Sequence, residues 1–164
     1  MTLGYSMSNC KNVRKDVLAI CILIPVLVGS LAALLTRNSM DFYSTIRTPS
    51  FAPPGFIFPI VWTILFVLMG ISCYLIYDSG SEQTKDALTW YIIQLGLNFA
   101  WSIIFFNFRL FLFAFIWIIV LWIAIFIMIR KFAKINKVAA YLQIPYLLWV
   151  TFATVLTLFI YILN

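Results

Sequence analysis

Residues 110–129 read LFLFAFIWIIVLWIAIFIMI, a stretch of twenty positions without a charged side chain. A helix of about 20 residues crosses the hydrocarbon core of a bilayer. Four more charge-free runs cover residues 17–35, 56–77, 87–106 and 138–163. Inside lipid, backbone N–H and C=O groups must pair within their own segment, so each run is expected to be helical. The sequence therefore predicts an all-α membrane protein, a bundle of five transmembrane helices that forms a single domain over residues 1–164.

The composition excludes an ordinary soluble protein. Hydrophobic residues make up 65% of the chain and charged residues only 10%, whereas a soluble domain has about 25% charged residues. The chain has no histidine, which is the commonest metal ligand and the commonest general base. Its three cysteines follow no metal-binding or redox spacing. We therefore expect no bound metal and no required cofactor.

The basic residues flank the predicted helices, so the net charge of +6 points to the lipid bilayer as a partner and not to nucleic acid. Arg37, Arg47 and Arg109 fall on one side of the membrane. The other eight fall on the opposite side: Lys11, Arg14, Lys15, Lys85, Arg130, Lys131, Lys134 and Lys137. The positive-inside rule then places the amino terminus in the cytoplasm and the carboxyl terminus outside. The first run could instead be a cleaved signal sequence, but it is longer than the usual apolar region of about 7–15 residues.

The segment 36–55 is the longest connection between predicted helices. It carries Pro49, Pro53 and Pro54 together with aromatic residues such as Tyr43 and Phe51. Prolines restrict the unfolded chain, and the rings can dock on the bundle. We predict a structured lid on the outer face; the alternative is a solvated connector.

The third predicted helix carries polar residues in the bilayer. Gln94, Asn98, Trp101, Ser102 and Phe105 follow the spacing i, i+4, i+7, i+8 and i+11, which is one helical face. A buried amide is costly unless it is hydrogen-bonded. The face is therefore either a contact between helices or one wall of a mostly apolar ligand pocket.

Two other helices present aromatic stripes. Tyr146, Trp149 and Ala153 share a face of the fifth helix, and Trp62 and Phe66 are neighbours on the second. Such stripes usually indicate packing, but with Gln94 and Asn98 nearby they favour a pocket for a flat ligand.

Three further features concern packing. Pro145 lacks a backbone N–H and can kink the fifth helix. Gly96 and Ala100 form a small-residue step that allows a close helix approach, which makes it a candidate dimer contact. The fourth helix, rich in Phe and Trp, is interpreted as structural and lipid-facing.

The chain resembles the tryptophan-rich sensory protein family, whose animal members are the translocator protein, or peripheral benzodiazepine receptor. The resemblance rests on three motifs: Phe42–Tyr43 with Pro49, Phe51, Pro53, Pro54, Trp62 and Leu65; Gln94 with Asn98, Trp101, Ser102, Phe105 and Phe106; and Pro145–Tyr146 with Trp149, Phe152, Ala153 and Leu156. Together they extend over most of the chain.

The resemblance implies a five-helix receptor, often a homodimer, in a bacterial cell membrane. It implies binding of porphyrins such as protoporphyrin IX and haem, and of benzodiazepine-receptor drugs. Light-dependent degradation of the porphyrin by Trp62 and Trp149 is also implied. The implied pocket comprises Tyr43, Pro53, Trp62, Phe66, Asn98, Trp101, Ser102, Trp149 and Ala153. From the residues themselves we add Gln94, Tyr146 and Arg47, the last as a partner for porphyrin propionates.

The chain departs from the family pattern at three places. Phe42 and Phe51 stand where the family usually has tryptophan, which keeps a stacking ring but removes an indole N–H. No basic residue follows Tyr161, so the cholesterol motif of animal members is absent. Two alternative functions stay open: a transporter of porphyrins or other tetrapyrroles, and a structural subunit. The absence of a visible internal repeat and of charged residues in the helices weighs against the transporter.

Overall fold

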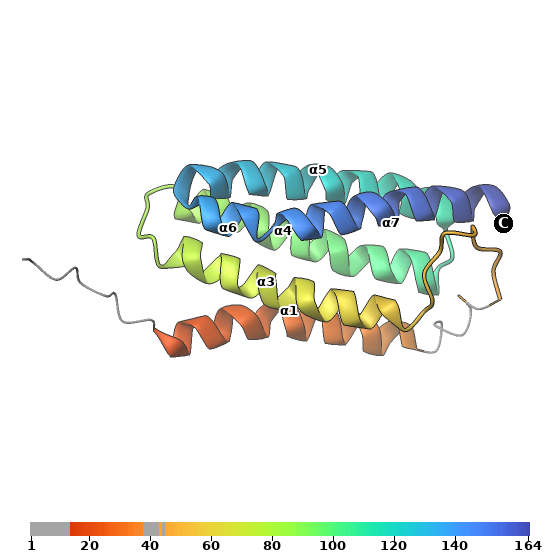
Figure 1. Cartoon of the computed structure of the whole chain (residues 1–164), viewed down its shortest axis with the longest axis horizontal. Helices are drawn as coiled ribbons and strands as arrows, with labels where there is room; N and C mark the ends of the chain where they lie inside the picture. The colour runs from red at the N-terminus through yellow and green to blue at the C-terminus, as the bar shows by residue number, and fades with distance from the viewer. Residues whose placement is uncertain (1–13, 38–42, 44) are drawn as a thin grey trace, which may run out of the picture.

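A computed structural model describes residues 14–37, 43 and 45–164 of the chain (Figure 1). Lys11 and Phe42 lie outside the described residues. The helices are α1 (Lys15–Thr36), α3 (Ile57–Tyr77), α4 (Thr84–Ser102), the π-helix η2 (Ile103–Asn107), α5 (Phe111–Ile135), α6 (Lys137–Tyr141) and α7 (Ile144–Leu163). Within the described ranges there is no strand.

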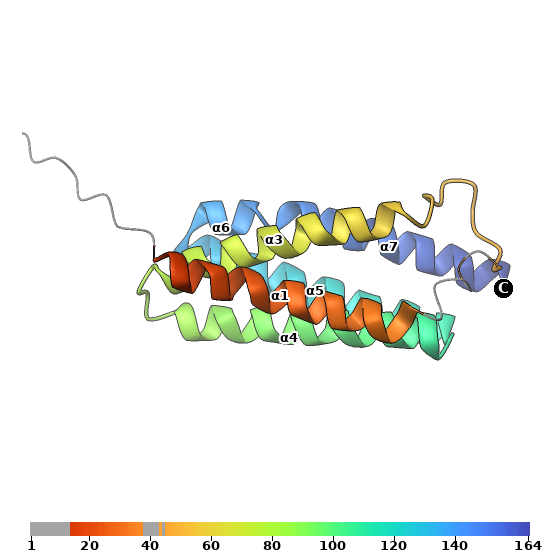
Figure 2. The same ribbon diagram turned by 90° about the horizontal axis from the view of Figure 1, so that it is seen from below.

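Five helical stretches are long and apolar enough to span a membrane, with α4 continuing into η2 and α6 continuing into α7. This confirms the predicted five-helix membrane architecture. All of them run along the long axis of the bundle (Figures 1 and 2). α1 packs mainly on α3, while α5 lies between α4 and α7. Most apolar side chains of α1 face outward, as expected of a helix that borders lipid.

The two ends of the bundle differ in charge. The start of α1, the α3–α4 connection and the end of α5 lie at one end (Figure 1), which we call the basic end because it carries Arg14, Lys15, Lys85 and four basic residues at positions 130, 131, 134 and 137. The carboxyl terminus and residues 45–56 lie at the opposite end, which we call the lid end.

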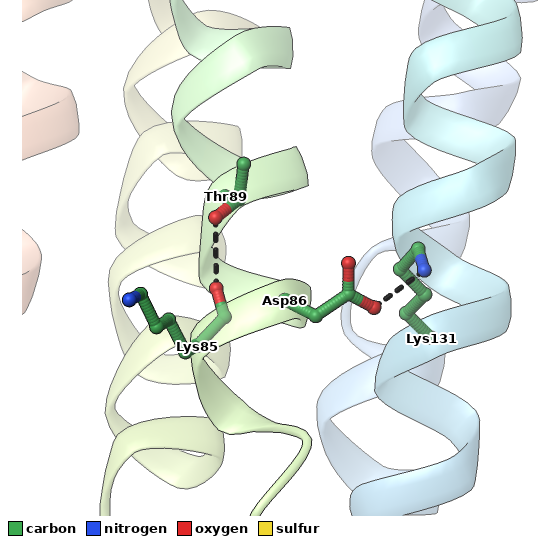
Figure 3. Close-up of polar contacts among 4 residues, drawn as sticks. All are labelled: Lys85, Asp86, Thr89 and Lys131. Carbon is green, nitrogen blue, oxygen red and sulfur yellow. Dashed lines mark hydrogen bonds and ion pairs between the residues drawn. The ribbon is translucent and has the colours of Figure 1, made fainter.

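An ion pair ties two helices together at the basic end. The Nζ atom of Lys131, near the end of α5, donates to Oδ2 of Asp86 in the first turn of α4 (Figure 3). In the neighbouring turn, Thr89 Oγ1 donates to the carbonyl oxygen of Lys85 at 2.9 Å. Asp86 also suits the positive amino-terminal end of the α4 dipole. The pair therefore fixes α4 against α5 outside the apolar part of the bundle.

Three helix boundaries differ from the predicted ones. The fifth stretch is interrupted by a turn at Leu142 and Gln143 between α6 and α7. Pro145 then occupies the first turn of α7, where its missing N–H costs nothing. α5 continues to Ile135, six residues past the charge-free run, since basic side chains are compatible with a helix once it leaves the lipid. The third helix ends in the π-turn η2.

The interpretation of the fourth helix as lipid-facing is only half right. One face of α5, including Ala114, Ile118, Leu121, Ile125 and Met128, is buried against α4 and α7. Its indoles also form bonds across to neighbouring helices. Trp117 Nε1 donates to the carbonyl oxygen of Leu97 at 2.9 Å, and Trp122 Nε1 donates to Thr151 Oγ1 at 2.8 Å. Only the opposite face of α5 is exposed to lipid.

The described part of the predicted lid contacts the bundle. The ring of Phe51 packs edge-on against Phe159 and Phe152 of α7, with centroids 5.3 and 6.3 Å away. The backbone N–H of Arg47 donates to Oδ1 of Asn164, and Asn164 Nδ2 donates back to the Arg47 carbonyl. Because residues 38–42 and 44 lie outside the described ranges, the lid as a whole stays a prediction.

Candidate ligand-binding site

A cavity of about 140 Å³ opens among the helices in the half of the bundle nearest the lid end. Its walls come from α1, α3, α4 with η2, and α7. The lining is mostly apolar and includes several aromatic rings. The residues are Gly29, Ala32, Ala33, Thr36, Tyr43, Phe58, Pro59, Trp62, Phe66, Asn98, Trp101, Ser102, Phe105, Phe106, Ala153, Leu156, Thr157 and Ile160.

Two stacked aromatic pairs line opposite helices of the cavity. On α3, Trp62 stacks on Phe66 with centroids 5.5 Å apart and an interplanar angle of 27°. On α4 and η2, Trp101 stacks on Phe105 at 5.3 Å and 26°. Each pair follows from i, i+4 spacing on a helix, which places the two side chains one above the other. The cavity therefore offers flat apolar surfaces from two sides.

A small-residue stripe on α1 makes room for these rings. A Cβ atom at Gly29 would lie only 2.0 Å from Cε2 of Phe66, so the Phe66 ring occupies the space that any other residue at position 29 would fill. Ala32, Ala33 and Thr36 continue the same face of α1 and also line the cavity. Gly70, nearer the basic end of α3, allows the same kind of close approach: an added Cβ there would lie 2.4 Å from the backbone of Ile22 on α1.

A chain of buried hydrogen bonds supports the polar part of the wall. Asn98 Nδ2 donates to the hydroxyl of Tyr146 at 2.9 Å, and that hydroxyl donates to Gln94 Oε1 at 2.9 Å. The exposed fractions of Gln94, Asn98 and Tyr146 are 0%, 5% and 1%. Asn98 therefore faces the cavity on one side and is held by α7 on the other. Ser102 Oγ donates to the Asn98 carbonyl at 3.4 Å.

Two donors at the cavity have no partner among the described residues. The Nε1 of Trp101 and the hydroxyl of Tyr43 are buried without a hydrogen bond among the described residues. Burial raises the pKa of the Tyr43 phenol above its ordinary value, because removal from water disfavours the phenolate. Tyr43 therefore stays neutral and can donate. Together the two groups favour a ligand that carries hydrogen-bond acceptors.

Seven of the twelve residues predicted to bind the ligand line this cavity: Tyr43, Trp62, Phe66, Asn98, Trp101, Ser102 and Ala153. Gln94 and Tyr146 lie directly behind Asn98 and hold it. Trp149 is absent from the lining; its ring lies 5.8 Å from that of Phe58 and 5.5 Å from that of Phe152. Pro53 is also outside the wall, and Arg47 is exposed. The roles of all twelve in binding stay predictions.

Sequence reasoning missed the contribution of α1. The spacing Gly29, Ala32, Ala33 and Thr36 is i, i+3, i+4 and i+7, a small-residue stripe that was available as a signal. Phe58, Pro59, Leu156, Thr157 and Ile160 were also missed. The π-turn η2, which carries Phe105 and Phe106, had no signal in the sequence, although such turns recur at functional sites.

Known proteins resemble this chain over most of its length. A profile of the TspO/MBR family matches residues 21–163. The chain belongs to the TspO/MBR family. It is 37% identical over 150 residues to the tryptophan-rich protein TspO of Chlorobaculum tepidum, which covers 90% of this chain and 95% of that protein.

Other members of the family are less similar in sequence to this chain. The tryptophan-rich protein TspO of Archaeoglobus fulgidus is 35% identical over 144 residues, covering 87% of this chain and 94% of the relative. The translocator protein of Bos taurus is 31% identical over 138 residues, covering 82% of each chain. The TspO/MBR family thus includes bacterial, archaeal and animal relatives that match over most of this chain.

Proposed function

We propose that this membrane protein is a receptor that binds porphyrins such as protoporphyrin IX and haem, and drugs of the benzodiazepine-receptor type, in the cavity between α1, α3, α4 and α7. The observation that carries the proposal is the combination of two stacked aromatic pairs with two buried donors that have no partner in the part of the chain that the structure describes. Flat apolar faces bind an aromatic ring system, and the donors select the polar groups at its edge.

The chemistry of the wall favours an aromatic ligand with carboxylate or amide groups. Trp101 Nε1 and the Tyr43 hydroxyl both require an acceptor. Porphyrin propionates and the carbonyl oxygen of a carboxamide drug are acceptors of this kind. Arg47 forms no ion pair among the described residues and is exposed at the lid end, so its guanidinium can meet a carboxylate that protrudes from the cavity. Metal-free porphyrin is the favoured ligand because the chain has no histidine to ligate iron.

Binding of a macrocycle requires the cavity to widen. Its volume of about 140 Å³ is below the roughly 300–1,000 Å³ of typical small-molecule sites. Tyr43 and Phe58 meet edge-on, with centroids 5.5 Å apart, and form the part of the wall next to the lid segment. We propose that these two rings separate when the ligand enters.

A light-dependent degradation of the bound porphyrin would draw on Trp62 and Trp149 as the tentative catalytic residues. Trp62 lines the cavity and its ring lies 6.1 Å from that of Tyr146. The ring of Trp149 does not line the cavity but lies 5.8 Å from that of Phe58, which does. The oxidant in this proposal is dissolved O2: the excited porphyrin takes an electron from an indole and passes it to O2, which leaves an indole radical cation and superoxide to attack the macrocycle. No acid–base residue is needed for these electron transfers. In this proposal Trp62 reacts first because it is in the wall, and no additional cofactor is required.

The setting of the receptor is also part of the proposal. We place it in a bacterial cell membrane with the basic end in the cytoplasm and the lid end outside, following the positive-inside rule. Gly96 lies exposed on α4 and an added Cβ would meet nothing within 4 Å. The Gly96–Ala100 step is therefore available for the close helix contact of a homodimer.

Titration of the purified protein with protoporphyrin IX in the dark and in the light tests the proposal. We expect saturable quenching of tryptophan fluorescence in the dark, followed under illumination by loss of the Soret band faster than for free porphyrin. A linear, unsaturable response would contradict the receptor. Saturable binding with bleaching equal to that of free porphyrin would retain the receptor and remove the degradation.

A further inference from the structure

Three polar side chains in the interior of the bundle lack the partners that their burial demands. The hydroxyl of Tyr91, the Nε2 atom of Gln94 and both side-chain amide atoms of Gln143 make no hydrogen bond within the described residues. Their side chains are 2%, 0% and 0% exposed. Native structures pair nearly all such groups with protein or ordered water, because an unpaired polar atom in a low-dielectric interior is costly. Something must satisfy these four atoms.

The four atoms belong to one layer of the bundle. Gln94 on α4 and Tyr146 on α7 are joined by a hydrogen bond of 2.9 Å. Tyr91 precedes Gln94 by three residues and Gln143 precedes Tyr146 by three, and both helices run from the basic end towards the lid end. Tyr91 and Gln143 are therefore each displaced by about one turn in the same direction.

The helix break explains why the Gln143 amide is available. The backbone N–H of Gln143 bonds to the carbonyl of Ala140, and the Gln143 carbonyl accepts from Leu147. Its side chain makes no capping bond at the start of α7. The amide is thus not needed to terminate either helix, yet it is fully buried. Much of the surrounding packing is apolar: the ring of Phe132 stacks 6.4 Å from Tyr91, and Ala139 and Ala140 are buried. The buried hydroxyl of Ser72 already donates to the carbonyl oxygen of Ala139 at 2.7 Å.

We propose that Tyr91, Gln94 and Gln143 form an internal site for ordered water. A water molecule both donates and accepts, and a buried one typically makes about three bonds to polar groups that have no other partner. One or two waters would satisfy the phenol, the amide nitrogen and the Gln143 amide together. None of the three residues lines the ligand cavity, so this site is separate from it. It extends the chain Asn98–Tyr146–Gln94 towards the basic end.

The water site would have a consequence for the cavity. Asn98 is held by Tyr146, Tyr146 by Gln94, and Gln94 by the water. The orientation of the one amide in the cavity wall then depends on hydration one turn or more behind it. This inference concerns the interior of the bundle and holds whatever the cavity binds.

Radiolytic hydroxyl-radical labelling of the purified full chain tests the site directly, because radicals generated from a bound water modify the side chain beside it. We expect Tyr91 to be modified in the wild type despite its burial, and the modification to fall several-fold in Gln143→Leu. An unmodified Tyr91 in the wild type overturns the proposal. The wild-type measurement needs no variant and so does not depend on whether Gln143→Leu folds.

Melting temperatures in detergent give a second, independent readout. If water joins the two side chains, Gln143→Leu and Tyr91→Phe each lower the melting temperature, and the double variant loses less than the two losses combined. Thr157→Val is the matched control. Thr157 is also buried on α7, but its hydroxyl bonds to its own helix about 21 Å from Gln143 along the helix axis, so its effect should add to that of Gln143→Leu. Single variants that both raise the melting temperature would show that the atoms are unpaired and the layer dry, and would overturn the proposal.

Discussion

Replacing Gly29 by alanine should impair ligand binding more than it impairs folding. The added Cβ would lie 2.0, 2.6 and 2.7 Å from three carbons of the Phe66 ring. Carbon atoms in contact normally lie about 3.5–4.0 Å apart, so the ring must move by roughly 1.5–2 Å. Phe66 lines the cavity and stacks on Trp62. The ring therefore moves at the expense of the cavity or of that stack.

The expected loss of affinity follows from comparing the cost of the substitution in the ligand-free and the ligand-bound protein. Without ligand, overpacking of about 1–3 kcal/mol is offset by about 1 kcal/mol of helix propensity gained from alanine, and the small cavity lets the ring relax. With ligand bound that space is filled, so the overpacking cost of about 1–3 kcal/mol falls on binding, which is a loss of roughly 5- to 150-fold in affinity. The melting temperature in detergent should change little.

Two glycines on other helices, Gly70 on α3 and Gly96 on α4, serve as matched controls in a protoporphyrin IX titration. At Gly70 an added Cβ meets the backbone of Ile22 and Cys21, which cannot move aside, so Gly70→Ala should lower the melting temperature more than Gly29→Ala does. At Gly96 an added Cβ meets nothing within 4 Å, so Gly96→Ala should leave the affinity of the monomer unchanged and raise its melting temperature slightly through the same gain in helix propensity. Normal affinity in Gly29→Ala, with Phe66 still in place, would refute the reasoning.

Three further predictions address the polar and aromatic groups. Asn98→Leu should weaken ligand binding by about 1–3 kcal/mol while the bundle stays folded; unchanged affinity with a lower melting temperature would make Asn98 a purely structural contact. Trp62→Phe should keep porphyrin binding but slow the light-driven loss of the Soret band, Trp149→Phe should do so to a smaller degree, and Trp117→Phe should change neither; equal bleaching in all variants would contradict this order. Because burial raises the pKa of Tyr43, its neutral form is favoured in the folded protein, so stability should be constant from about pH 6 to 9 and fall above about pH 10. Tyr43→Phe should lessen that alkaline decline, and an identical decline in wild type and variant would show that Tyr43 is not its source.

The five membrane-spanning stretches were predictable because hydrophobicity and the absence of charge alone determine them. The helix boundaries that were not predicted depend on other causes. The turn at Leu142 and Gln143 lies within a charge-free run. Hydropathy therefore does not predict it, although Pro145 indicated a possible kink. α5 continues to Ile135 because a helix does not end where lipid ends. The π-turn η2 arises from the packing at the end of α4 and is invisible to periodicity.

The candidate site was predictable where its residues carry unusual chemistry. Amides and indoles are rare enough in a transmembrane helix that the spacing of Asn98, Trp101 and Ser102 indicated a common face. The α1 wall was missed because Gly29 and Ala32 contribute space and no functional group. Trp149 shows where helix-face reasoning stops: it shares a face with Tyr146 and Ala153, but its ring contacts Phe58 and does not line the cavity, which only the three-dimensional packing determines. Its role in binding stays a prediction.

A structure of the protein with protoporphyrin IX bound is the most direct test of the account. We expect the macrocycle between the Trp62–Phe66 and Trp101–Phe105 pairs, with Tyr43 and Phe58 moved apart and acceptor atoms of the ligand within hydrogen-bond distance of Trp101 Nε1 and the Tyr43 hydroxyl. A macrocycle bound on the outer surface of the helices, with the cavity unchanged, would contradict the proposal that this cavity is the binding site.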